Sequence, residues 1–191
     1  MASKRKSSDS ADTAGETRKT PQSGGARRRE PLLIEVAFEV VNQLGGIYTV
    51  MRSKVPAMME RWGTRYCLVG PYEPEAAAVE FEERTPTGPF GEAVKRMREW
   101  GLDAHFGTWL VTGKPRVILF DPRSVYNRLG EVKYRFWEQH GITFPDNDDL
   151  MNQVVAFSFL LEQFSHALCE REGERRKIVM HLHEWMGGAA I

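Results

Sequence analysis

The chain has 191 residues, of which 41% are hydrophobic, and its 26 basic and 26 acidic side chains give a formal net charge of zero. This length suits one domain of about 150 residues with a short extension. No run reaches the roughly 20 apolar residues of a membrane helix, and no apolar segment follows the first basic residues as it would in a secretory leader. The sequence therefore predicts a cytoplasmic protein that does not span a membrane.

Residues 1–30 differ in composition from the rest, with eight Lys or Arg, four Asp or Glu and no aromatic residue. Such a segment cannot bury enough apolar surface to offset the entropy of ordering, so we predict a disordered basic tail. A basic tail can bind nucleic acid, but this one lacks the aromatic side chains that stack on bases. We expect a solvated leader with no nucleic-acid partner, and a folded domain over residues 31–191.

Apolar runs and helical stripes alternate along residues 31–191. Strands are predicted at 33–41, 65–70, 104–111, 116–121 and 177–182, and helices at 47–61, 90–100, 124–139 and 149–172. The third and fourth strands are close enough in sequence to form a hairpin-like pair. Strands that alternate with helices predict an α/β fold whose sheet is mostly parallel and covered by helices on both faces.

Gly45 and Gly46 directly follow the first predicted strand and open the first predicted helix. A glycine pair lets backbone N–H groups approach a ligand closely, and a helix N-terminus favours an anion such as phosphate. The spacing matches neither the dinucleotide fingerprint nor the Walker motif. A plain tight turn therefore remains the alternative.

Two histidines, a glutamate and a tryptophan end the last predicted strand. His181 and His183 are two residues apart on a strand, so their side chains point to the same side. This spacing also occurs in metal sites, although no further cluster of ligands is evident in the sequence. We predict that His181 is a buried core histidine and that His183, nearer the strand end, is placed to bond a sugar hydroxyl. Glu184 is expected to cap the next helix and Trp185 to be a packing residue.

Three further residues complete the set of candidates. Asn152 lies in the first turn of the helix predicted over 149–172, from which it can point back into a cleft. Cys67 and Cys169 are isolated, have no metal spacing and lie among apolar residues, so we predict two buried free thiols.

The segment from Glu35 to Val50 and the closing run from His181 to Trp185, taken together, resemble the N-terminal domain of glycogen synthases of the animal and fungal type. The resemblance continues through residues 66–72 and 106–115, and it covers essentially all of residues 32–191. It implies a Rossmann-like domain of the two-domain architecture called GT-B. The activity implied is transfer of glucose from UDP-glucose to the non-reducing 4-hydroxyl of an α-1,4-glucan, with retention at the anomeric carbon.

The resemblance also implies roles for particular residues. Gly45 and Gly46 correspond to the loop beside the donor diphosphate, His183 to the histidine that contacts the donor glucose, and Asn152 to a polar position near the sugar. No metal or other cofactor is expected, since helix dipoles and basic side chains stabilise the departing UDP in this architecture. The full-length protein is expected to be a homo-oligomer.

The second domain of the family, with the glutamate usually assigned as catalytic and most nucleotide contacts, is absent from these 191 residues. We therefore expect an incomplete, truncated domain that is inactive by itself. Two alternatives stay open, namely a non-catalytic module that binds nucleotide or glucan, and a different sugar-nucleotide transferase of the same architecture.

Overall fold

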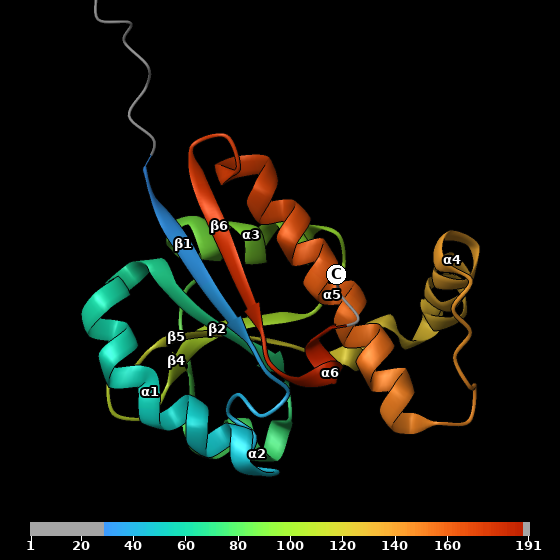
Figure 1. The fold of residues 1–191 in the computed structure, drawn as a ribbon, viewed down its shortest axis with the longest axis horizontal. Coiled ribbons are helices and arrows are strands. Elements are labelled where there is room, and N and C mark those ends of the chain that lie inside the picture. Colours follow the sequence, from blue (N-terminus) through green and yellow to red (C-terminus); the bar gives the residue numbers. More distant parts are fainter. Residues whose placement is uncertain (1–28, 189–191) are drawn as a thin grey trace, which may run out of the picture.

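The computed structural model describes residues 29–188, whose helices and strands are labelled in Figure 1. In chain order the elements are β1 (Arg29–Val36), α1 (Gly46–Trp62), a 3-10 turn (Gly63–Arg65), β2 (Tyr66–Pro71), α2 (Pro74–Glu80), β3 (Phe81–Glu83), α3 (Gly88–Glu99), β4 (Ala104–Trp109), β5 (Arg116–Phe120), a 3-10 helix (Pro122–Arg128), α4 (Leu129–His140), α5 (Asp149–Glu172), β6 (Arg176–Leu182) and α6 (Glu184–Gly188). Within this part of the chain, no helix is long and apolar enough to cross a membrane.

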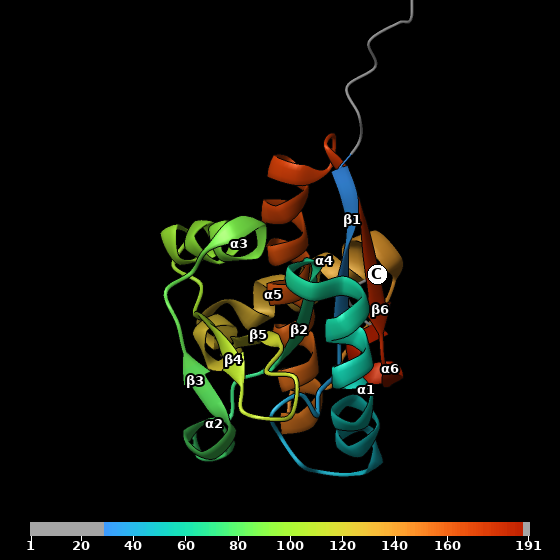
Figure 2. The same ribbon diagram turned by 90° about the vertical axis from the view of Figure 1, so that its left-hand side faces the viewer.

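The six strands form one sheet in the order β3-β4-β5-β2-β1-β6, with β3 and β6 at its two ends (Figure 2). β1 pairs in parallel with β2 and β6, and β2 pairs in parallel with β5. β4 pairs antiparallel with both β3 and β5. The predicted mostly parallel sheet and the predicted hairpin-like pair are both confirmed. Because β5, β2, β1 and β6 run in one direction, their carboxyl ends lie along a single edge of the sheet.

Helices cover both faces of the sheet, as predicted. α1 packs on one face through Tyr48, Met51 and Val55, all of which are buried against β1 and β2. α3 and α5 cover the other face, and Figure 1 shows α1 and α5 on opposite sides of the diagonal pair β1 and β6. With helices on both faces, the central strands are apolar on both sides, which explains their continuous hydrophobic runs.

The longest helix, α5, has the bounds 149–172 that the sequence predicts. Asp148 caps it, because its side-chain Oδ1 accepts the backbone N–H of Met151 at 2.9 Å. Buried side chains of α5 fill the layer between the sheet and α3, and Phe157 meets the Phe38 ring edge-on at a centroid distance of 5.0 Å.

The first predicted strand is displaced. It was expected over residues 33–41, whereas β1 begins at Arg29, whose N–H donates to the Arg175 carbonyl at 2.9 Å, and ends at Val36. Residues 37–41 are equally buried but form a loop, so their apolar character reflects burial rather than a strand. The tail boundary expected at residue 30 therefore falls two residues inside β1. Residues 1–28 of the predicted tail lie outside the described residues.

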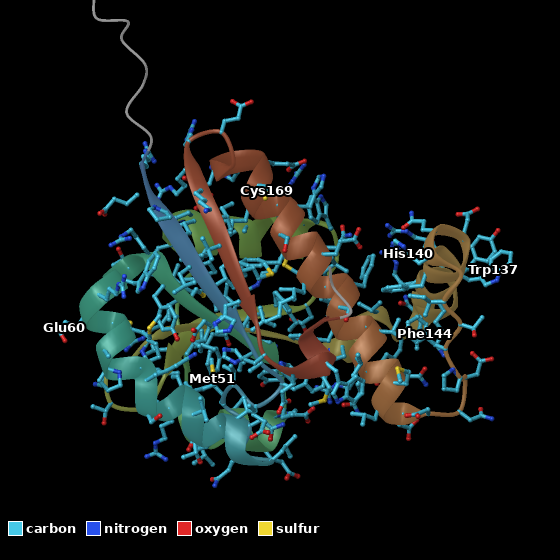
Figure 3. The ribbon with its side chains drawn as sticks, in the orientation of Figure 1. Met51, Glu60, Trp137, His140, Phe144 and Cys169 are labelled. Atoms are coloured by element: carbon cyan, nitrogen blue, oxygen red, sulfur yellow. The ribbon has the colours of Figure 1, made fainter. Side chains whose placement is uncertain are left out.

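Two other expectations are corrected. The segment from Pro74 to Glu83 forms α2 and β3, neither of which the sequence predicted. The helix expected over 124–139 is instead a 3-10 helix followed by α4. α4 lies beside α5 at one end of the molecule, and Figure 3 shows Trp137 on its outer side.

Candidate functional site

A hollow of about 630 Å³ lies where the parallel strands end. It is lined by the loops that follow β1 and β2, the start of α5, and α6. Its lining residues include Phe38, Leu44, Glu73, Gln153 and Met186. Ligands of open α/β sheets bind outside the carboxyl ends of the strands, so this edge is the candidate site.

The glycine pair lies at this edge. Gly46 is the first residue of α1 and Gly45 is its N-cap. The carboxylate of Glu39 accepts the N–H of Gly45 at 2.8 Å and that of Tyr48 at 2.9 Å, both through Oε2. Glu39 is buried, and a Cβ on Gly45 would lie 3.0 Å from its Oε1, whereas a Cβ on Gly46 would meet nothing within 4 Å. A side chain at Gly45 would therefore crowd the Glu39 cap, whereas Gly46 borders open space that a ligand can enter.

His183 follows β6 and is tied to the end of β1, because its backbone N–H donates to the Val36 carbonyl at 2.9 Å. Its imidazole Nε2 lies 3.3 Å from the ammonium of Lys54, in the third turn of α1. The rings of His181 and His183 are 4.2 Å apart between centroids. His183 thus shares the carboxyl edge with the glycine pair, but its side chain meets the middle of α1 rather than its N-terminus.

A buried glutamate completes this group. Glu35 of β1 lies opposite His181 in the β1–β6 register, and its side chain is only 3% exposed. Its Oε1 accepts a hydrogen bond from Lys54 at 2.8 Å, and its Oε2 accepts one from the Tyr66 hydroxyl at 2.6 Å. The Nδ1 of His181 lies 3.4 Å from the same Oε1. We call Glu35, Lys54, Tyr66, His181 and His183 the Glu35 cluster.

The cluster sets the charges of its members. Burial tends to raise the pKa of Glu35, but the hydrogen bonds from Lys54 and Tyr66 and the charge of Lys54 bring it below the ordinary value. Burial and the hydrogen bond to Glu35 raise the pKa of Tyr66. Burial, together with the positive charge of Lys54 and the proximity of His181, lowers the pKa of His183. The cluster therefore contains one carboxylate, one ammonium and a neutral His183.

The cluster bears directly on the metal-ligand spacing noted in the sequence. Glu35 supplies the carboxylate that was not recognised there, and ligand atoms of Glu35, His181 and His183 all lie within 4.8 Å of one another. However, the Lys54 ammonium contacts the carboxylate and one of the imidazoles, so the chain's own cation already pairs with two of these three groups. A metal ion bound by these atoms would compete with Lys54 for Glu35 and His183.

The remaining predicted residues are placed as follows. The Nδ2 of Asn152 donates to the Asp146 carbonyl at 3.1 Å, and its Oδ1 is buried without a hydrogen-bond partner. The next residue, Gln153, lines the hollow instead. His181 was expected to be buried but is 55% exposed, because β6 is the end strand of the described sheet. Trp185, expected to be a packing residue, lies on α6 and is 58% exposed. Glu184 is the first residue of α6 rather than a cap before it.

The backbone is strained at the same edge. Val41, in the loop before the glycine pair, has φ of 64°, and Glu184, directly after His183, has φ of 63°. Residues with a Cβ rarely adopt this left-handed conformation, and when they do they are often found at functional sites. A third such residue, Lys114, lies in the β4–β5 turn away from this edge.

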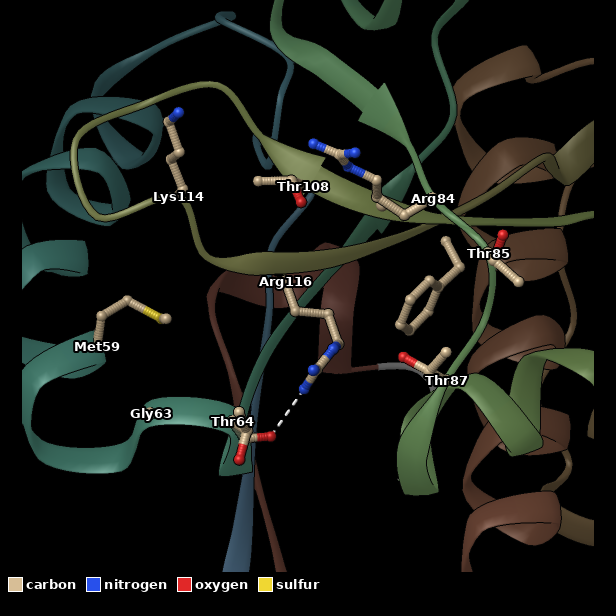
Figure 4. Close-up of a pocket in the computed structure, with 11 residues that line it drawn as sticks. Met59, Gly63, Thr64, Arg84, Thr85, Thr87, Thr108, Lys114 and Arg116 are labelled. Atoms are coloured by element: carbon tan, nitrogen blue, oxygen red, sulfur yellow. Dashed lines mark hydrogen bonds between the residues drawn. The ribbon is translucent and has the colours of Figure 1, made fainter.

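A smaller hollow of about 230 Å³ lies where β2 and β5 begin and is lined by Arg84, Lys114 and Arg116 (Figure 4). The three cations point in different directions, and the Arg116 guanidinium is bonded to the Thr64 carbonyl at 2.7 Å. They do not converge on one position, so this hollow is not an anion site of the kind that a phosphate requires.

Comparison with known proteins shows which family the chain resembles. Residues 35–191 match the family model described as glycogen synthase. The chain is 40% identical over 162 residues to the glycogen [starch] synthase of Neurospora crassa, a match that covers 84% of this chain and 23% of that protein. It is 35% identical to glycogen [starch] synthase isoform 1 of Saccharomyces cerevisiae and 34% identical to the liver glycogen [starch] synthase of Mus musculus, each over 84% of this chain. The chain thus spans about a quarter of the length of these relatives.

Proposed function

Because the chain belongs to the glycogen synthase family, we propose that it forms the N-terminal half of a retaining glucosyltransferase site. The donor is UDP-glucose, and the acceptor is the non-reducing 4-hydroxyl of an α-1,4-glucan. The other half of the cleft, including the catalytic glutamate, is supplied by a second Rossmann-like domain. These 191 residues alone therefore bind donor weakly and do not turn it over.

One observation carries this proposal. Gly45 and Gly46 at the start of α1, and His183 at the end of β6, follow two neighbouring parallel strands at the carboxyl edge. The open side of Gly46 receives the donor diphosphate at the N-terminus of α1, and His183 contacts the donor glucose. Asn152 is assigned a supporting place near the sugar. No step is assigned to a metal ion.

The two residue types contribute differently to the reaction. The N-terminus of α1 stabilises negative charge on the departing diphosphate, which grows as the bond to the glucose breaks. A neutral imidazole bonds a glucose hydroxyl without adding a positive charge beside the anomeric carbon. The lowered pKa of His183 supports this second role.

The test uses the longer protein that contains the second domain. His183→Ala should lower turnover by about two to three orders of magnitude, the cost of losing one well-placed donor to a transition state. Folding of the variant is checked by circular dichroism, and His166→Ala, an exposed histidine on α5, is the matched control. Unchanged turnover in His183→Ala would refute the assignment of His183.

A second candidate, a glucan-binding module without catalysis, is favoured by one observation. A hollow of about 320 Å³ continues from the main one and is lined by Tyr72, Tyr126, Asp149 and Gln153. Aromatic rings beside polar groups suit sugar rings. Calorimetry of the 191-residue chain with UDP-glucose, UDP and maltooligosaccharides distinguishes the two candidate functions. Only a glucan-binding module is expected to bind glucan strongly and to show no response to UDP.

A further inference from the structure

We infer that Lys54 is a positioning residue that holds the imidazole of His183 in one tautomer, with its hydrogen on Nδ1. This inference rests on the proposed function, in which His183 contacts the donor sugar, and it adds a residue to that site. Lys54 lies in the third turn of α1, far in sequence from His183. Its ammonium group links α1 to His183.

The direction of the hydrogen bond follows from the chemistry of the two groups. A lysine ammonium has three N–H donors and no acceptor. Its contact of 3.3 Å with Nε2 of His183 therefore requires Nε2 to be the acceptor. A neutral imidazole has one bare nitrogen and one protonated nitrogen, so the hydrogen must lie on Nδ1. Nδ1 is then the atom that donates to a sugar hydroxyl.

Lys54 is itself fixed by the elements around it. Its ammonium also donates to Glu35 Oε1 at 2.8 Å, and Glu35 is held by the Tyr66 hydroxyl on its other oxygen. The nearby α1 residues Met51 and Val55 are fully buried, and their packing against the sheet fixes the position of Lys54 relative to the strands. Three elements, α1, β1 and β2, therefore fix Lys54 and through it determine which nitrogen of His183 carries the hydrogen.

The same contacts argue for a lysine rather than a metal ion as the cation at this position. Lys54 neutralises the buried carboxylate of Glu35, whose other contacts are with the Tyr66 hydroxyl and the His181 ring. A bound divalent ion would take the lone pair of a histidine nitrogen and would need the place of the ammonium. The internal cation contacts Nε2 of His183, so Nδ1 is the ring nitrogen that donates to a substrate.

Nuclear magnetic resonance of the ¹⁵N-labelled 191-residue chain tests this without any need for activity. His183→Gln identifies the His183 ring signals by their loss. We expect wild type to have a protonated Nδ1 and a bare Nε2. Lys54→Met should shift the ring towards the Nε2–H tautomer, Lys54→Arg should retain the wild-type pattern, and Lys95→Met, which alters an exposed lysine on α3, should change nothing.

Three outcomes would overturn the inference: a protonated Nε2 in wild type, a wild-type pattern in Lys54→Met, or full capture of the His183 ring by equimolar zinc. If Lys54→Met fails to fold because Glu35 is left unpaired, the double variant Lys54→Met with Glu35→Gln removes the buried charge and keeps the same readout.

The longer protein separates this inference from the proposed function. If both hold, Lys54→Met lowers kcat by about tenfold to a hundredfold, changes KM for UDP-glucose less, and is partly rescued by Lys54→Arg. If glucosyl transfer is absent but the tautomer results stand, the proposed function fails and the role of Lys54 survives. If glucosyl transfer is present and the His183 tautomer does not change in Lys54→Met, only the role of Lys54 fails.

Discussion

Glu35 is a carboxylate placed inside a sheet, and side chains from other elements keep it ionised. Lys54 and Tyr66 each donate to one of its oxygens, so removal of the carboxylate leaves a partly buried ammonium and a buried hydroxyl without an acceptor. We expect Glu35→Ala to lower the free energy of unfolding by about 2 to 3 kcal/mol. Urea denaturation followed by circular dichroism at neutral pH measures this loss, which the exposed-site control Glu162→Ala should not show.

The lowered pKa of Glu35 also predicts how stability depends on pH. A carboxyl group whose pKa is lower in the folded than in the unfolded chain stabilises the fold above its unfolded pKa. This contribution is lost as the pH falls through the folded value. With an ordinary value of 4.5, the loss is expected below about pH 4.5. Urea midpoints measured through the acid range should fall less steeply in Glu35→Gln than in wild type, and parallel curves would contradict the prediction.

The two adjacent glycines have different roles and provide a matched pair of variants. In Gly45→Ala the new Cβ would lie 3.0 Å from Glu39 Oε1 and would disturb the cap of α1, at a cost of about 1 kcal/mol. In Gly46→Ala the Cβ meets nothing within 4 Å, so stability should be retained. Thermal unfolding of both variants measures this difference. In the longer protein, Gly46→Ala should still weaken donor binding, because the methyl group enters the space assigned to the diphosphate.

At the scale of the elements, the longest helix, α5, is held in the fold by its many buried side chains. Phe157 is fully buried and contacts the rings of Phe38 and Phe120 at centroid distances of 5.0 and 5.9 Å. Phe157→Ala should cost about 3 to 5 kcal/mol, because it removes a large side chain and leaves a cavity. On the same helix, Glu162→Ala alters an exposed residue and should stay within about 0.5 kcal/mol of wild type. Equal urea midpoints for the two variants would show that α5 does not anchor the core.

The elements also show what a sequence can predict about this fold. α5 was located with its observed bounds because it is long, has a capping aspartate and is apolar on most of its surface. β1 was placed several residues too late, since residues 37–41 are buried in a loop and burial, rather than strand geometry, made them apolar. α2 and β3 were not predicted, because elements of seven and three residues are too short to show a periodic pattern of hydrophobic residues.

The candidate site was only partly predictable for a related reason. Gly45, Gly46 and His183 follow predicted strands, so their place at the carboxyl edge follows from the parallel order of the sheet. Glu35 is different, because its link to His181 requires knowing that β1 and β6 are neighbours in a register that pairs these residues across 146 positions. The one sign of Glu35 in the sequence is that it is a lone acidic residue in the apolar part of a strand. The exposure of His181 likewise depends on strand order, which local sequence does not encode.

At the scale of the whole molecule, two apolar layers share the central strands. Alternate residues of β2 point into different layers, since Cys67 and Val69 face α3 and α5 while Tyr66 and Leu68 face α1. Loss of either layer exposes one side of the same strand. We therefore expect residues 29–188 to unfold as one cooperative unit rather than layer by layer.

The two cysteines can test this cooperativity. Contrary to the sequence-based expectation that both are buried, Cys67 is buried and Cys169 is exposed near the end of α5 (Figure 3). Burial raises the pKa of the Cys67 thiol to about 12, so it is protonated as well as shielded in the folded chain. A thiol reagent should therefore modify Cys169 at once, and Cys67 only when the sheet opens.

The variant Cys169→Ser leaves Cys67 as the one thiol and makes the measurement direct. Under conditions where refolding is faster than labelling, the ratio of the labelling rate to that of the unfolded chain gives the free energy of opening. If the two layers unfold together, this free energy equals that from urea denaturation, and Phe157→Ala lowers both by the same amount. Labelling of Cys67 at a markedly lower free energy than global unfolding would mean that one layer can detach while the other remains folded.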